Sequence, residues 1–478
     1  MPELNVFNVG GLELYKNPLS RNDADLIESV NVYSDFYGNQ TKRPGLITYL
    51  GTADGSAVNS LFTFGRNDGT TFYNYRASGS LLYYSLQGTS SWAICGNGTI
   101  SPGAHVGNAI LGNTMIIGDG VGSTRHTTNG TSFTDTVLAP IADSFAQYQN
   151  RIFANGTAGD LFYSTTGDAT NWLTSGTSDS SSISIPGAGK NGKIFRAVDR
   201  LIITKNSQLM YRWDGFALVD MSTNKGPSSP YCIDSIGDYW FWQNSDGLYG
   251  YQGAVPQIIG NSVSRFYSNT YGTPISGTAI GTIPAATHQY DYFSAMGTVA
   301  DDFSQETIND AVLKYDFLQN QFTTYSYPIK PTTFLSYKDE NGNQQFLIGA
   351  SNGQVYQQSA GTYSDDGTAI ESRMQFFTHC GAPFLRKKFN FLDLFFNPGC
   401  QARVQYAITN NFSAQYKQWK DFQKGTMVEG HNQYRFEVPI NQTDPAVGKF
   451  LFVRITEKST DKPFSFYGYS VTFELMRR

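Results

Sequence analysis

Residues that commonly carry out catalysis or bind metals are few and scattered in this chain of 478 residues. The five histidines form no pair four residues apart, and the four cysteines show neither Cys-x-x-Cys nor another zinc-site spacing. We therefore expect no metal and no cofactor, and we interpret the cysteines as isolated, mostly buried thiols of a protein made in a reducing compartment. The residues concerned are His105, His126, His288, His379 and His431, and Cys95, Cys232, Cys380 and Cys400.

Paired carboxylates are the second possible source of chemistry. Hydrolysis of a glycosidic bond by two carboxylates requires the groups to lie about 5–10 Å apart, and Asp301-Asp302 with Glu306, or Asp365-Asp366, offer them. Adjacent aspartates in polar loops are usually solvated tips. A sialidase would also need converging arginines, for which the candidates are Arg151, Arg196, Arg200 and Arg212. We therefore predict that the protein is not an enzyme, and we keep a glycoside hydrolase or glycan-binding protein as the alternative.

Two further runs have binding as an alternative interpretation. The run Tyr239-Trp240-Phe241-Trp242 could stack on sugar rings, but four aromatic residues in one short strand more often pack in a core. The basic run at residues 386–388 begins a strand near the C-terminus. Its default interpretation is a solvated rim, and its functional interpretation is contact with a partner protein or with DNA phosphates.

Composition indicates an all-β protein. Gly (48 residues), Tyr (30) and Phe (34) are abundant, and charged residues make up only 15% of the chain. Aromatic residues favour strands, and Gly serves tight turns. The net charge of −5 argues against a dedicated nucleic-acid-binding protein. The charge is uneven, because the chain from Glu371 onward carries 15 Lys and Arg against 9 Asp and Glu, which suggests two modules.

No segment predicts secretion or membrane insertion. The start Met1-Pro2-Glu3-Leu4 lacks the basic residues and apolar run of a signal peptide. No apolar run approaches the ~18 residues that a membrane helix requires. We expect no membrane insertion by this chain.

The elements that must position these residues follow a repeat. A polar residue and usually Gly separate short aromatic-rich strands, and a hydrophobic residue follows soon after. These turns lie near residues 88, 130, 167, 215, 253, 320 and 361. Apart from one gap of 67 residues, the spacing is close to the period of roughly 40 residues that four-stranded propeller blades give. We predict a β-propeller of six or seven blades, and we favour seven.

The repeat divides the chain into three parts. The propeller is expected over residues 56–368, with an insertion at about 258–287 that accounts for the long gap. Residues 1–55 form an N-terminal segment outside the repeat, with one short helix expected at residues 22–30. Residues 369–478 contain longer strands with apolar residues on one face, which predicts an antiparallel β-sandwich. We expect the N-terminal segment to join this sandwich in one platform.

Short motifs mark the N-terminal segment in a fixed order: Gly10-Gly11-Leu12, then Asn17-Pro18, then a stretch ending in Asn31-Val32, then Lys42-Arg43-Pro44-Gly45. This order is similar to the opening of tail nozzle proteins, also called tail hub or tail stabilisation proteins, of short-tailed bacteriophages. Later segments are similar too, including residues 245–249 and 264–267. The resemblance therefore extends over nearly the whole chain.

The resemblance implies a structural protein of the virion, located in the phage tail and made in the host cytoplasm. Members of that family form a homo-oligomeric ring, typically a homohexamer, below the portal and its adaptor, or head completion, protein. The ring extends the DNA channel, retains the packaged genome and passes it during ejection, with only transient, non-specific contact to double-stranded DNA. Tail fibres or spikes are the further partners. An acidic wall would suit such a channel, because it repels phosphate.

Function is then expected in the parts that do not repeat. The candidate assembly residues are Gly10, Gly11, Asn31, Arg43, Pro44, Gly45, Arg386, Lys387 and Lys388. The candidate residues of a channel or gate loop are Ser262, Ser268, Tyr271, Thr273 and Pro274. A tail-associated or secreted glycan-binding propeller or glycoside hydrolase stays open as the alternative function.

Overall fold

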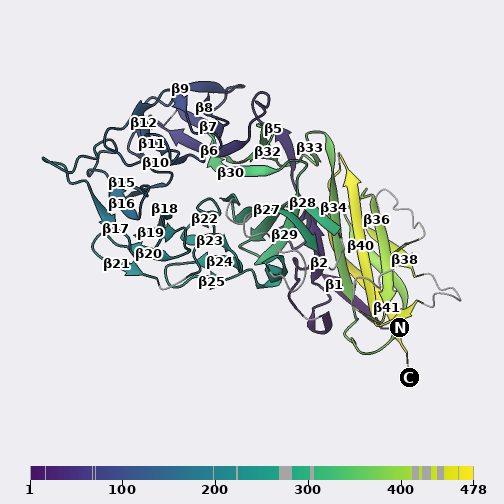
Figure 1. Cartoon of the computed structure of the whole chain (residues 1–478). Coiled ribbons are helices and arrows are strands. Elements are labelled where there is room, and N and C mark those ends of the chain that lie inside the picture. Colours follow the sequence, from purple (N-terminus) through teal and green to yellow (C-terminus); the bar gives the residue numbers. More distant parts are fainter. Residues whose placement is uncertain are drawn as a thin grey trace.

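Short antiparallel strands build a ring of blades, and a second body of longer strands lies at one side of it (Figure 1). This computed structural model describes residues 2–16, 18–66, 68–69, 71–197, 199–221, 224–267, 283–301, 306–411, 419–422, 432–438, 446–460 and 462–476. The protein is all-β, as predicted, with short 3-10 helices at η1 (Pro18–Ser20) and η2 (Asn261–Tyr267). Within these ranges no helix is long and apolar enough to cross a membrane.

Five blades follow one another along the chain, each an antiparallel sheet of four strands in sequence order. Their first strands lie next to one another, as β14 does between β10 and β18, and so surround the propeller axis. The strands are β6 (Val58–Gly65), β7 (Phe72–Ser78), β8 (Leu81–Leu86) and β9 (Ala93–Thr99); β10 (Gly107–Leu111), β11 (Thr114–Gly118), β12 (Arg125–Thr127) and β13 (Thr134–Asp135); β14 (Phe145–Tyr148), β15 (Arg151–Ala154), β16 (Asp160–Tyr163) and β17 (Ser181–Ser184); β18 (Asn191–Ala197), β19 (Arg200–Lys205), β20 (Met210–Trp213) and β21 (Leu218–Asp220); and β22 (Ile233–Ile236), β23 (Tyr239–Asn244), β24 (Gly247–Tyr251) and β25 (Gln257–Ile258).

The sixth blade joins strands that are far apart in the sequence. It contains β30 (Pro331–Lys338), β31 (Gln344–Ala350), β32 (Val355–Ser359) and, as its outer strand, β5 (Gly45–Thr48). β5 runs antiparallel to β32, with Gly45 opposite Ser359 and Thr48 opposite Tyr356. The N-terminal segment therefore closes the ring by supplying the outer strand of this blade.

A seventh four-stranded unit belongs to both bodies. It contains β26 (Ala285–His288), β27 (Asp291–Asp301), β28 (Glu306–Asp316) and β29 (Gln321–Ser326). β26 lies next to β22 and β30, so this unit completes the ring, while β29 pairs in parallel with a platform strand through Thr324. The prediction of six or seven blades is confirmed in this form: six blades are separate sheets, and the seventh unit is continuous with the platform.

The repeated turns are hairpin connections, and local chemistry explains them. The Asn129 side chain accepts the backbone N–H groups of Thr131 (2.9 Å) and Ser132 (3.0 Å), and Gly130 adopts a φ of 81°. Asn stabilises such a turn and Gly tolerates a positive φ, which is why both recur. Between the turns, strands such as β7 are buried along nearly their whole length, because neighbouring blades cover both faces.

The platform consists of two sheets. One contains β3 (Val32–Ser34), β4 (Gln40–Lys42), β41 (Ser465–Leu475), β35 (Lys387–Phe396) and β38 (Gln433–Glu437), with β1 (Glu3–Phe7) paired to β41 and β39 (Val447–Gly448) paired to β35. The other continues from β29 through β2 (Leu26–Val30), β34 (Thr368–Thr378), β40 (Phe450–Ser459), β36 (Ala402–Thr409) and β37 (Lys420–Asp421), with β33 (Ser364–Asp365) beside β34.

The two platform sheets share one apolar core. The Phe376 ring of β34 stacks on Tyr469 of β41 with centroids 4.3 Å apart, and both side chains are fully buried. Val6 and Leu26 from the N-terminal segment lie in the same core. Both ends of the chain therefore build this body, and strands β1 and β41 pair directly, with Glu3 opposite Thr472.

Two expectations for the N-terminal segment are wrong. Residues 22–30 form no helix: the polar residues make a turn, in which Asp25 N–H donates to the Asn22 carbonyl (3.1 Å), and β2 follows. All five residues of β2 are buried, because β29 and β34 pair with it on either side. The propeller does not begin at residue 56, because β5 already belongs to it.

Within the insertion at 258–287, residues 268–282 lie outside the described part.

Gly45 provides a test of the closure. A Cβ atom at this position would lie 2.1 Å from the Ser364 carbonyl oxygen, so β5 could not keep its place beside β33. We expect Gly45→Ala to lower the free energy of unfolding by about 1–3 kcal/mol, the usual cost of forcing atoms into a packed site. Equilibrium urea denaturation measures the loss.

Gly10→Ala is the matched control. The nearest atom to a Cβ there is 3.5 Å away, which is ordinary contact, so this variant should unfold like the wild type. Equal losses of stability in the two variants would contradict the close packing of β5 against β33.

Candidate functional site

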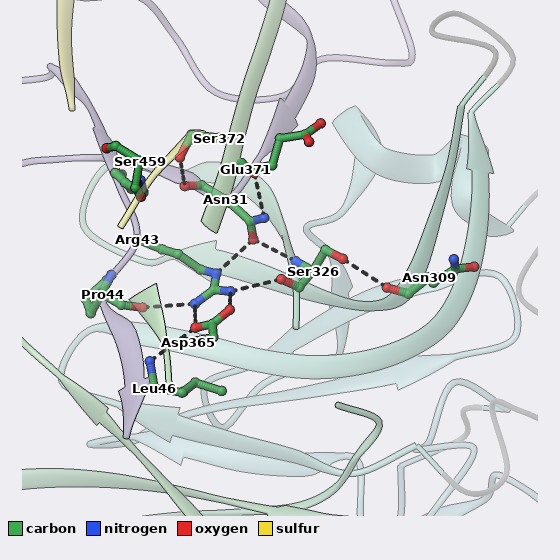
Figure 2. Close-up of polar contacts among 11 residues, drawn as sticks. Asn31, Arg43, Pro44, Leu46, Asn309, Ser326, Asp365, Glu371, Ser372 and Ser459 are labelled. Atoms are coloured by element: carbon green, nitrogen blue, oxygen red, sulfur yellow. Dashed lines mark hydrogen bonds and ion pairs between the residues drawn. The ribbon is translucent and has the colours of Figure 1, made fainter. Parts of the chain in front are cut away.

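A cluster of buried polar residues joins the propeller to the platform. We call it the junction cluster, and it consists of Asn31, Arg43, Ser326 and Asp365 (Figure 2). Asn31 follows β2, Arg43 precedes β5, Ser326 ends β29, and Asp365 ends β33. The fold brings the ends of these four elements, which belong to both bodies, to one place.

Arg43 is the centre of this cluster and is fully buried, with 0% of its surface exposed. Its Nε donates to Asn31 Oδ1 (2.8 Å), and Nη1 donates to Asp365 Oδ1 (2.8 Å) and to the Pro44 carbonyl (3.0 Å). Nη2 donates to the Ser326 carbonyl (3.0 Å) and to the second oxygen of the Asp365 carboxylate. All five N–H donors of the guanidinium are thereby used. The guanidinium also lies over the Tyr327 ring, 4.4 Å from its centroid.

Asn31 connects Arg43 to the sheets of both bodies. Its backbone N–H donates to the Thr324 carbonyl of β29 (2.8 Å), and its side-chain amide donates to the Glu371 carbonyl of β34 (2.8 Å). Its Oδ1 accepts the Ser326 N–H (2.8 Å) as well as Arg43 Nε. The residue adopts a φ of 57°, a left-handed conformation that Asn tolerates better than most residues.

Asp365 carries the connection to the closing strand. Besides its bidentate pair with Arg43, its Oδ1 accepts the Leu46 backbone N–H of β5 (3.1 Å). The interpretation of Asp365 as a solvated loop tip is wrong, because its side chain is buried in this pair. No local pattern signals the pairing, since the two partners are 322 positions apart.

Gly10 and Gly11 also lie where the N-terminal segment passes against the propeller. Leu12 N–H donates to the Phe322 carbonyl of β29 (2.9 Å), and a Cβ on Gly11 would lie 2.8 Å from Cβ of Gln321. Gly11 therefore allows the segment to pass against the blade, while Gly10 has room for a side chain. Nearby, the Leu14 N–H donates to the Ser262 carbonyl (2.7 Å), so Ser262 contacts the N-terminal segment.

The other predicted loop residues, Ser268, Tyr271, Thr273 and Pro274, lie outside the described residues. The basic run lies away from the junction cluster, at the start of β35 in the platform. Arg386 is exposed and Lys388 is half-buried, but Lys387 is buried, and its ammonium donates to two backbone carbonyls, of Ala382 (2.5 Å) and Leu385 (2.7 Å). Burial lowers the pKa of Lys387. The interpretation of the run as a solvated rim is therefore wrong for Lys387.

A separate cavity of about 470 Å³ lies on the propeller axis, lined by residues of β6, β10, β18, β22, β26 and β30. Asp143 at its wall forms an ion pair with Lys190 (2.8 Å). Burial raises the pKa of Asp234 and lowers the pKa of Lys193, both of which line the cavity. Two carboxylates are thus balanced by two lysines, which fits a polar axis inside the fold.

The thiols and the metal-binding side chains form no reactive cluster in the part of the chain that the structure describes, and the side chains of Asp301, Asp302 and Glu306 lie outside that part. All four cysteines are buried and unpaired, and burial raises the pKa of the Cys232 thiol to about 11. No group of three His, Cys, Asp or Glu that could hold a metal ion occurs among the described residues. Residues 349–353 have the spacing Gly-x-Ser-x-Gly, but the strand β32 follows them where a nucleophile elbow requires a helix. Phe241 and Trp242 are core residues, as expected.

No family model and no curated protein matches this chain. Among solved structures, YCF48 from Cyanidioschyzon merolae is 10% identical with a TM-score of 0.44 and covers 66% of this chain and 98% of its own. The WD40 domain of Neurospora crassa Pan2 is 6% identical with a TM-score of 0.41 and covers 66% and 94%. The computationally designed Ika8 protein is 12% identical with a TM-score of 0.40 and covers 66% and 99%.

The Arg43–Asp365 pair can be tested with a double-mutant cycle. Arg43→Met should lower the free energy of unfolding by about 3–5 kcal/mol, because it leaves a buried carboxylate without its partner. Arg43→Met/Asp365→Asn should cost less than the sum of the two single variants, by about 0.5–3 kcal/mol. Urea denaturation of the four proteins measures this coupling.

Arg403→Met is the control, because Arg403 forms an ion pair of similar geometry with Asp421 (2.7 Å) on the platform surface. Both of those side chains are exposed, so the loss should be much smaller. A coupling energy of zero between Arg43 and Asp365 would refute the role assigned to the pair.

Proposed function

We propose that this protein is a structural component of a phage virion, the tail nozzle or hub whose copies form a ring below the portal and adaptor. The observation that supports the proposal most is the composite platform. Strands from both ends of the chain, β1 and β41 among them, share one sheet, and the propeller emerges from this body as a single side arm. The resemblance of the N-terminal motifs implies this division of labour.

The position of the chain ends also supports the proposal. Both termini lie at the end of the platform that is far from the propeller (Figure 1). The propeller therefore leaves this end of the platform free for contact with the next copy in the ring. The propeller is then the surface on which tail fibres or spikes would attach, and the platform the part that would contact the adaptor.

The junction cluster would hold the propeller and the platform rigidly together in this arrangement. A ring that retains a packaged genome needs its parts held in fixed positions, and the buried guanidinium fixes the propeller to the platform at one point. No step of the proposed role requires catalysis. DNA would pass through the ring without sequence-specific contact.

The full chain, purified and imaged by negative-stain electron microscopy, tests the proposal. We expect closed rings, most often of six copies, with a central hole and propellers at the rim. Mass photometry of the same sample should give a multiple of 52.8 kDa. A protein that stays monomeric at all concentrations and degrades or binds capsular polysaccharide would contradict the proposal in favour of the glycan-binding alternative.

A further inference from the structure

The tip of the platform carries an exposed apolar surface. We call it the tip patch, and it consists of Phe384, Leu385, Leu475 and Met476, of which Phe384 is 71% exposed. The four residues are neighbours, because Leu475 lies opposite Lys387 in the sheet and Met476 N–H donates to the carbonyl of Arg386 (3.0 Å). Clusters of exposed apolar side chains on one surface commonly mark interaction sites.

The buried Lys387 holds this patch in shape. Its ammonium donates to the carbonyls of Ala382 and Leu385, at the two ends of the loop that contains Phe384. Placing a lysine inside the platform costs free energy, which a solvated loop would not require. The lysine instead keeps the loop folded with Phe384 and Leu385 directed outward, which points to a partner for these side chains.

A second exposed apolar surface lies at the seam of the two bodies. We call it the seam patch, and it consists of Phe7, Phe36, Tyr37 and Leu318. Phe36 and Tyr37 occupy the tip of the turn between β3 and β4 and are 89% and 76% exposed. Such turn tips normally carry polar residues or Gly.

Neighbouring contacts hold the seam patch together. The Phe36 and Tyr37 rings meet edge to face with centroids 5.5 Å apart. Phe7 packs against Phe395 at 5.5 Å, and its neighbour Asn8 lies against Gly38 of the β3–β4 turn. The turn of Leu318 is bonded to the β3–β4 turn through Gln319 and the Asp35 carbonyl.

The two patches lie at opposite ends of the same pair of strands. At one end of the β35–β41 pair, Lys387 is opposite Leu475 beside the tip patch. At the other end, Phe395 is opposite Gly468, and Gly468 is opposite Phe7 of the seam patch. Ten residues of β35 separate the patches by about 30 Å at ~3.3 Å per residue. One small partner molecule could not cover both.

We propose that copies of this chain associate head to tail, with the tip patch of one copy packed on the seam patch of the next. A heterologous contact requires two different interaction surfaces, and the platform carries two exposed apolar patches at its opposite ends. A two-fold dimer needs only one self-complementary surface. Charge also favours contact between the tip patch and the seam patch, because the exposed Arg386 flanks the tip patch and Asp35 lies in the β3–β4 turn of the seam patch. The head-to-tail contact does not depend on the proposed function. Only the closure of several such contacts into a ring rests on it.

Two variants and their mixture test the proposal by sedimentation velocity. The tip variant is Phe384→Asp/Leu385→Ser, and the seam variant is Phe36→Asp/Tyr37→Ser. Each alone should sediment as a monomer, because one half of every contact is lost. An equimolar mixture should form a one-to-one dimer and nothing larger, because the intact seam patch of the tip variant meets the intact tip patch of the seam variant.

Phe216→Asp is the matched control, since Phe216 is 97% exposed on the propeller, away from both patches, and this variant should assemble like the wild type. Circular dichroism verifies that all three variants are folded. A tip variant that still assembles, or a mixture that stays monomeric, would overturn the proposal. Assembly of the seam variant alone would overturn it as well, since it would show a contact between two tip patches.

The outcomes separate this contact from the proposed function. If the wild type forms rings and both variants also form rings, the head-to-tail contact through these patches is wrong while the nozzle proposal stands. If the mixture dimerises as expected but the wild type forms open filaments, the contact is supported and the nozzle proposal fails. A wild type that is monomeric at every concentration overturns both.

Discussion

The bidentate pair between Arg43 and Asp365 is the interaction on which the two-body structure depends. It connects the residue before the closing strand of the propeller to the hairpin that enters the platform, and Asn31 and Ser326 extend it to β2 and β29. A buried ion pair contributes little stability over a well-packed apolar substitute. We interpret its role as fixing the register and relative position of the elements, because the guanidinium is satisfied only when all of them are in place.

Other features follow from this constraint. The propeller is closed by β5, which begins two residues after Arg43, so the segment that closes the ring also carries the contact with the platform. Gly45 must lack a side chain because Ser364 lies against it. The seam patch is centred on the tip of the β3–β4 hairpin, whose base adjoins Asn31 and Arg43, and the tip patch lies at the far end of the platform. In the proposed head-to-tail contact, the junction would therefore also set where one copy meets the next.

The sequence predicted the repeating parts well, because their pattern is local. Turn residues such as Asn129 and Gly130 recur at the period of a blade, and strand alternation distinguished the platform from the propeller. The errors concern long-range partners. Residues 22–30 have a helix-like start, but β29 and β34 pair with β2 and override it. Asp365 looked like a loop tip and Lys387 like a rim residue, since their burial depends on residues that only the fold brings close. Arg43 and Asn31 were identified through a family resemblance, without any indication of their partners.

Hydrogen–deuterium exchange of the full chain, wild type against Arg43→Met, tests whether the Arg43–Asp365 pair couples the propeller to the platform. If the pair holds both bodies in one unit, amides of β5 and of β34 should lose protection together, while those of the distant blade β14–β17 keep theirs. Loss of protection in β5 alone, or in neither strand, would contradict this coupling, because the propeller closure and the platform would then be independent of each other.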